Sequence, residues 1–107
     1  GHVVHPDAVK AQMEGGVVWG LSFTMNEEIT IENGRVVEGN FTDYPVLSLA
    51  HTPQIETIIM PSGGFWGGVG EPPIGGVIPA IGNALFEATG ERVRSMPLRK
   101  LGYSYKT

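Results

Sequence analysis

Cysteine is absent from this 107-residue chain. Its absence excludes disulfides, thiolate metal sites, iron–sulfur ligation and cysteine nucleophiles. Charge is also sparse, because charged residues make up 17% of the chain and leave a net charge of −4. No hydrophobic run approaches the ~18 residues that a membrane-spanning helix needs. Basic and aromatic residues do not interleave as they do in nucleic-acid-binding surfaces, so no nucleic-acid partner is predicted.

Glycine, by contrast, is abundant, with 16 of the 107 residues, about twice the usual share of roughly 7%. Most of this excess lies between Gly63 and Gly76 and in the first predicted helix. Hydrophobic residues make up 41% of the chain, which is ordinary for a globular protein. The length allows one modest core, so residues 1–107 are predicted to form a single domain.

The acidic and basic residues are unevenly distributed. All 11 acids precede residue 92, whereas the final segment has no acid and carries Arg92, Arg94, Arg99, Lys100 and Lys106. A basic segment of this kind either binds phosphates or an acidic partner surface, or is a solvated terminus.

A helix is predicted from Pro6 to about Met25. Pro6 suits the first helical position, and hydrophobic residues then recur every four positions: Val9, Met13, Val17, Leu21 and Met25. Another face of the same helix carries Gln12, Gly15, Gly16, Trp19, Gly20 and Phe23. Interior glycines weaken a helix, so something must approach this face closely, either a neighbouring helix or a flat ligand.

The remaining pattern predicts short strands and a second helix. Residues 28–32 and 35–38 form strands joined by the turn signal Asn33-Gly34, and residues 54–60 form a third strand. A helix is predicted over 77–89, with Pro79 in its first turn and Gly90 at its end. Residues 92–96 are a further candidate strand. The predicted fold class is α+β, with two helices packed on a small, mainly antiparallel sheet of three or four strands.

Glu71 is the main candidate for chemistry. It lies between a glycine-rich run and Pro72-Pro73, just before the second predicted helix, where free N–H groups favour an anion. A carboxylate fixed in this way can act as a general base. The alternatives are a solvated loop carboxylate or a local helix cap. His2 and His5 have no third ligand nearby, and His51 stands alone, so no metal ligands are predicted.

Two motifs carry a resemblance to a known family. Residues 68–73, G-V-G-E-P-P, precede an apolar helix that ends in Thr89-Gly90, and residues 12–16, Q-M-E-G-G, lie upstream at a fitting distance. Together they resemble the C-terminal part of the xanthine oxidase/aldehyde oxidase family of molybdenum hydroxylases. Residues 33–47 are similar to the bacterial branch that contains isoquinoline 1-oxidoreductase and membrane-associated aldehyde dehydrogenases. The resemblance covers residues 3–98.

This resemblance implies specific roles. Glu71 would be the base that activates a hydroxyl on molybdenum, and Gln12 and Gly70 would contact the cofactor, a molybdopterin cytosine dinucleotide. The substrates would be aldehydes or N-heteroaromatic carbons, and electrons would leave through an iron–sulfur subunit. Compartment is left open between cytoplasm and periplasm or membrane surface. Trp19 and the Phe65-Trp66 pair depart from the family's pattern, which leaves the pocket's shape open.

The family's catalytic chain is far longer than 107 residues. The chain is therefore predicted to be a C-terminal segment of that subunit, completed by the rest of it, and to be inactive and free of molybdenum when alone. Two other hypotheses remain. One is a small α+β module that binds a flat ligand without catalysis, and the other is an interaction module whose basic segment docks on an acidic partner.

Overall fold

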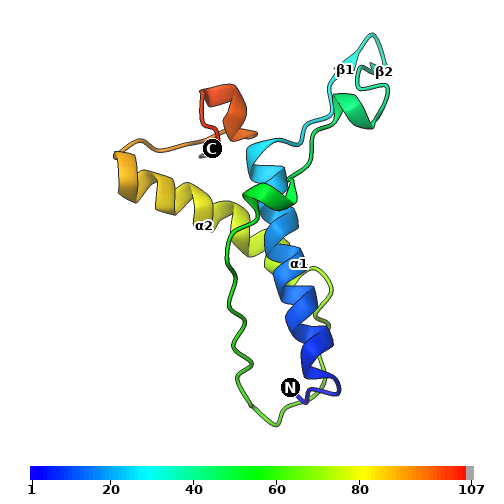
Figure 1. Cartoon of the computed structure of the whole chain (residues 1–107), viewed down its shortest axis with the longest axis vertical. Helices are drawn as coiled ribbons and strands as arrows, with labels where there is room; N and C mark the ends of the chain where they lie inside the picture. The colour runs from blue at the N-terminus through cyan, green and yellow to red at the C-terminus, as the bar shows by residue number, and fades with distance from the viewer. Residues whose placement is uncertain (106–107) are drawn as a thin grey trace.

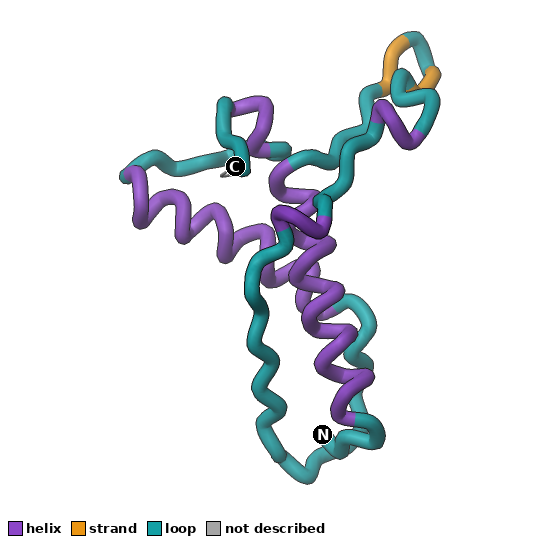
Figure 2. The backbone as a smooth tube through the Cα atoms, in the orientation of Figure 1, coloured by secondary structure: helices purple, strands orange, loops and turns teal. Residues whose placement is uncertain are grey.

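The structure is a computed structural model that describes residues 1–105. It is elongated, with extents of 50 × 36 × 25 Å, and two long helices cross near its middle (Figure 1). A small hairpin projects from one end, and a long loop runs beside the first helix toward the other end (Figure 2). Within the described residues, no helix combines the length and apolar character needed to cross a membrane.

Helix α1 spans Pro6–Met25 and confirms the predicted bounds. Pro6 occupies the first turn, where the missing N–H costs no helical hydrogen bond. His5 is the N-cap residue, and its Nδ1 accepts a hydrogen bond from the backbone N–H of Ala8 at 3.1 Å. This histidine therefore has a structural role at the helix start.

Helix α2 spans Pro72–Thr89 and begins five residues before the predicted start. Pro72 and Pro73 fill its first two positions, so the proline pair opens the helix instead of preceding it. Pro79 consequently lies inside the helix, which corrects its expected place in the first turn. Gly90 ends α2 in the left-handed conformation (φ 76°), and its N–H donates to the Phe86 carbonyl at 2.7 Å, as predicted.

The glycine face of α1 is the place where α2 crosses it. A Cβ added at Gly16 would lie 2.8 Å from the Cβ of Pro73. A Cβ added at Gly20 would lie 2.8 Å from the Cβ of Val77 and 3.1 Å from the carbonyl oxygen of Ile74. Of the two alternatives that the sequence left open, the neighbouring helix is therefore correct at these two glycines.

The sheet is smaller than the sequence predicts. Within residues 1–105 it consists of β1 (Ile31–Glu32) and β2 (Arg35–Val36), paired antiparallel. The predicted turn is confirmed, with Asn33 at φ 50° and Gly34 at φ 75°. The expected strands at 54–60 and 92–96 are wrong for the described residues, because neither segment has a neighbouring strand to pair with. The hairpin also projects from the helices rather than supporting them, so the α+β class holds without a helix-covered sheet.

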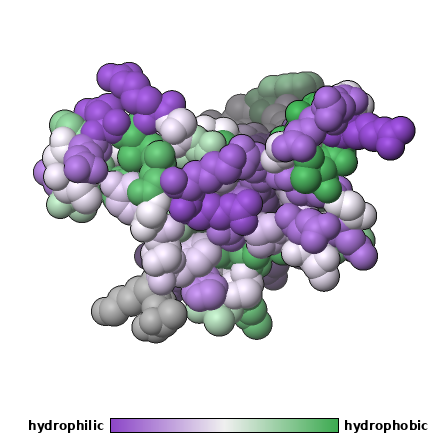
Figure 3. Space-filling model, turned by 90° about the horizontal axis from the view of Figure 1, so that it is seen from above, coloured by the Kyte–Doolittle hydropathy of each residue, from purple (hydrophilic) through white to green (hydrophobic). Residues whose placement is uncertain are grey.

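Short 3₁₀ helices fill the remaining chain: η1 (Phe41–Asp43), η2 (Leu49–His51) and η3 (Leu98–Leu101). The core is small, because Met25 and Leu98 are the buried large hydrophobic residues of the described chain. Lys100 ties η3 back to the end of α1 by donating to Glu28 Oε1 at 2.7 Å. Figure 3 shows hydrophobic residues open to solvent among hydrophilic ones. The chain therefore has little interior of its own.

Candidate functional site

A hydrogen bond joins the two sequence motifs. The side-chain Nε2 of Gln12, on the second turn of α1, donates to the backbone carbonyl of Gly70 at 3.2 Å. These residues are 58 positions apart, and Gly70 directly precedes Glu71. The structure thus brings together the three residues that the sequence singled out, although Gln12 contacts the peptide before Glu71 and not its carboxylate.

Glu71 is the N-cap residue of α2, and its side chain makes no capping hydrogen bond. Its own carbonyl accepts from the N–H of Ile74 at 3.0 Å. Because Pro72 and Pro73 carry no N–H, the donors expected beside the carboxylate are missing, which corrects the predicted stabilisation by free helix-terminal N–H groups. The carboxylate is exposed and has no hydrogen-bond or ion-pair partner among residues 1–105.

Four residues on one face of α1 hold α2 in this position. The Gln12 side chain donates a hydrogen bond to the Gly70 carbonyl. At Gly16 and Gly20 the backbone of α1 lies in close contact with α2. Thr24 is fully buried, and its Oγ1 donates to the Gly20 carbonyl at 2.7 Å. Residues four apart lie on one helix face, so this face is continuous. It fixes the start of α2, and with it the backbone of Glu71, against α1.

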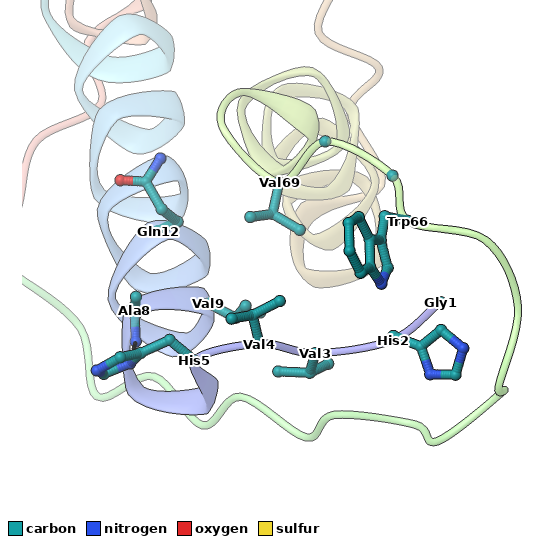
Figure 4. A pocket seen from close by; sticks show the side chains of 12 residues that line it. Gly1, His2, Val3, Val4, His5, Ala8, Val9, Gln12, Trp66 and Val69 are labelled. Carbon is teal, nitrogen blue, oxygen red and sulfur yellow. Dashed lines mark hydrogen bonds between the residues drawn. The ribbon is translucent and has the colours of Figure 1, made fainter.

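A cavity of about 470 Å³ lies between the start of α1 and the loop that precedes α2 (Figure 4). Its walls come from residues 1–5, from the α1 residues Ala8, Val9 and Gln12, and from the loop residues 66–69. Trp66 and Val69 extend from the loop toward the N-terminal segment, and the N–H of His2 donates to the Gly64 carbonyl at 3.2 Å. Glu71 does not line this cavity, whose wall along the loop ends at Val69.

Other glycines of the chain have open space where a side chain would be. Nothing lies within 4 Å of a Cβ added at Gly15, Gly67, Gly68 or Gly70. The backbone N–H groups of residues 67–70 also make no hydrogen bond within the described chain. A ligand can therefore approach the backbone along this loop, where unpaired donors point to a polar or anionic group.

A second groove of about 500 Å³ lies further along α1, beside its C-terminal half. It is mostly apolar and is lined by Gly15, Val18, Trp19, Ser22, Phe23, Glu27, Phe41, Tyr44, Val46 and Leu47. The Tyr44 hydroxyl donates to Glu27 Oε2 at 2.7 Å, and this hydrogen bond raises the pKa of Tyr44 above its ordinary value of 10. The contact fastens the segment after the hairpin to the end of α1.

The basic segment is partly engaged within the chain. Arg92 donates to Asn83 Oδ1 at 3.1 Å and lies 3.7 Å above the ring centre of Phe86, a cation–π arrangement. Lys100 pairs with Glu28, and Lys106 lies outside the described residues. These contacts support a structural role for part of the segment.

Sequence reasoning missed the residues that complete these contacts. Pro73 packs against Gly16 of α1 and Val77 packs against Gly20. Val69 lines the cavity beside Trp66. The spacing of Gly16 and Gly20, four residues apart on a helix, is the signal for the first pair. No comparable signal in the sequence identifies Val69, because its role depends on how the loop folds back.

Comparisons with known proteins agree with the motifs. The molybdopterin cofactor-binding domain family matches residues 1–53. A membrane-bound aldehyde dehydrogenase of Gluconacetobacter polyoxogenes, whose name specifies pyrroloquinoline quinone, is 46% identical over 99 residues. The beta subunit of isoquinoline 1-oxidoreductase from Brevundimonas diminuta is 40% identical over 99 residues. Each match covers 92% of this chain and 13% of the relative.

A solved structure has the same arrangement of elements. The crystal structure of the Cu,Mo-containing carbon monoxide dehydrogenase superposes with a TM-score of 0.74 and 26% identity. The match covers 95% of this chain but 15% of that chain. The chain therefore spans roughly one-seventh of the proteins it matches, and its open shape is found there as part of a much longer polypeptide.

Proposed function

We propose that this chain is the C-terminal segment of the catalytic subunit of a molybdenum hydroxylase. The premise is that residues 1–53 belong to the molybdopterin cofactor-binding domain family. The chain also resembles one segment of the molybdenum hydroxylases. The reaction is hydroxylation of an aldehyde or of an N-heteroaromatic carbon. The observation that carries this proposal is the hydrogen bond from Gln12 to Gly70, which joins the two motifs next to Glu71.

The residues present suit one wall of a molybdopterin site. The Gln12 amide and the unpaired N–H groups of residues 67–70 can bind a polar heterocycle or a phosphate, and the bare backbone at Gly67, Gly68 and Gly70 leaves room for it. The bound molybdenum cofactor would supply a two-electron acceptor for substrate oxidation. We assign Gln12 and Gly70 to this wall, and the cytosine dinucleotide form is part of the proposal.

Glu71 acts as the base in this proposal. Its carboxylate accepts the proton of the hydroxyl whose oxygen is transferred to the substrate carbon, and that oxygen becomes a stronger nucleophile. The exposed, unpartnered side chain supports this role, because no internal hydrogen bond has to break first. The helix contact at Gly16 and Gly20 holds the backbone of Glu71 while the proton moves.

The surroundings of the chain complete the proposal. The rest of the catalytic subunit would supply the remaining walls of the site, and an iron–sulfur subunit would carry the electrons away, since the chain itself has no cysteine. The exposed hydrophobic surface supports this arrangement over an independent ligand-binding or interaction module, which would need a closed core.

Cofactor analysis of the full-length subunit tests the proposal. Purified from its native reading frame, it should contain molybdenum and a pterin dinucleotide, measured by elemental analysis and by chromatography of the released cofactor. Pyrroloquinoline quinone without molybdenum would overturn the cofactor assignment. The 107 residues alone should bind no molybdenum and oxidise no aldehyde, and turnover by this segment would contradict its being one wall of a site.

Replacing Gln12 tests the contact that joins the motifs. In Gln12→Glu the side chain keeps its size, but a carboxylate then faces the Gly70 carbonyl and no longer donates to it. Loss of one such hydrogen bond is worth about 0.5–1.5 kcal/mol, so kcat should fall up to roughly 10-fold, with lower molybdenum content. Glu14→Gln, on an exposed position of the same helix, is the control. Unchanged kcat and molybdenum in Gln12→Glu would remove Gln12 from the site.

A further inference from the structure

The segment between Pro53 and Pro61 is extended and has no neighbouring strand among residues 1–105. It runs beside α1 as an open trace (Figures 1 and 2), and its backbone N–H and C=O groups form no hydrogen bond with any residue of the described chain. Exposure alternates along it: Ile55, Thr57 and Ile59 are half-buried, whereas Glu56, Ile58 and Met60 are exposed. A period of two residues is the side-chain pattern of a β-strand.

The chain as a whole has more surface than a compact protein of its mass. Its accessible surface is 8005 Å², whereas a compact chain of this size exposes about 5,800 Å². Its radius of gyration is 16.5 Å against about 13 Å for a compact domain of this length. The excess of about 2,200 Å² on this one chain is more than twice the ~800 Å² that each partner contributes to a stable protein interface of standard size.

The exposed segment contributes hydrophobic surface to this excess. Ile58 and Met60 are 72% and 76% exposed. The carbon monoxide dehydrogenase structure has the same open arrangement, and the 107-residue chain matches 15% of that longer chain. We therefore expect this surface to be covered by other polypeptide of the full-length subunit rather than by a small ligand.

We propose that residues 54–60 form a β-strand that pairs with a strand of the remaining catalytic subunit. The proposal rests on the proposed function in one respect, namely that the chain is a segment of a longer subunit. Strand addition would satisfy the unpaired backbone groups and cover Ile58 and Met60 with alternate side chains of the partner sheet. Pro53 and Pro61 limit the pairing to the residues between them, about 23 Å of strand.

Hydrogen–deuterium exchange on the full-length subunit tests this pairing. Amides of residues 54–60, which are unbonded within the described chain, should exchange at least about 100-fold more slowly in the full-length subunit than in an unstructured peptide of the same sequence. Exchange at the rapid rate of the peptide would overturn the proposal. The readout needs neither molybdenum nor turnover, so it remains informative if the proposed function fails.

Two variants separate pairing from simple burial. Thr57→Pro and Ile58→Pro remove N–H groups that point to opposite edges of a strand, so at least one of them should abolish the protection across residues 54–60. Thr57→Val favours a strand and should retain it. Protection that survives both proline variants would contradict strand pairing. In the 107-residue chain alone the segment should exchange rapidly, and concentration-dependent protection there would instead identify a second copy as the partner.

Discussion

Glu71→Gln is expected to lower kcat of the full-length enzyme by about 10²–10⁴-fold, the range that a positioned general base contributes. Glutamine keeps the size of the side chain but cannot accept the proton. The carboxylate has no hydrogen-bond or ion-pair partner among residues 1–105 and lies at a helix N-cap, so the substitution leaves the packing of α1 and α2 intact. Steady-state turnover of an aldehyde, divided by the molybdenum content of the same preparation, measures the effect.

The control lies on the same helix. Glu87 is also exposed on α2, near its other end, and Glu87→Gln should leave kcat unchanged. Glu71→Asp retains a carboxylate but shortens its reach, so it should recover part of the lost turnover. Full activity in Glu71→Gln with normal molybdenum content would remove Glu71 as the base, and the proposed mechanism with it.

Gly20→Ala is expected to destabilise the helix pair by about 1–3 kcal/mol, as forced overpacking does. The added Cβ would meet Val77 Cβ at 2.8 Å and the Ile74 carbonyl at 3.1 Å. Neither neighbour is the end of a flexible side chain, so α2 must shift as a whole. Alanine normally favours a helix over glycine by about 1 kcal/mol, and the clash must exceed this gain. The midpoint of thermal unfolding of the full-length subunit should therefore fall.

Gly15→Ala is the matched control for that experiment. Gly15 is on the same helix, and nothing lies within 4 Å of a Cβ built on it. This substitution should leave the midpoint unchanged or raise it, because only the helix propensity changes. A Gly20→Ala variant as stable as Gly15→Ala would show that α2 does not pack against Gly20 in the assembled protein.

The sequence was sufficient to predict the elements that local chemistry determines. The bounds of α1, the turn at Asn33-Gly34 and the cap at Gly90 each depend on a few adjacent residues. The start of α2 is predicted too late because Pro79 is assigned to the first turn, whereas Pro72 and Pro73 open the helix and Pro79 lies inside it. The strand predicted at residues 54–60 is absent from the structure, because a strand requires a partner and residues 1–105 contain none for it.

The sequence likewise identified part of the candidate site and left another part undecided. The motifs identified Gln12, Gly70 and Glu71, and the structure brings them together through one hydrogen bond. The sequence could not decide whether a helix or a ligand approaches the glycines of α1, since both require the same absence of side chains. The positions of Pro73 and Val77 show that a helix approaches Gly16 and Gly20. At Gly15 no residue approaches within 4 Å, so this position has space for a ligand.

The position of Glu71 at the junction between a packed helix pair and a glycine-rich loop has an evolutionary consequence. The helix contact fixes its backbone, whereas Phe65 and Trp66 belong to a loop whose glycines have free space around them. Substitutions in this loop can therefore reshape the pocket wall without displacing the carboxylate, as is usual where a rigid scaffold carries variable loops. Under the proposed function, substrate range and proton transfer could then diversify independently, and variants selected for a new aldehyde would be expected to accumulate changes in residues 62–66 before any at Gly16 or Gly20.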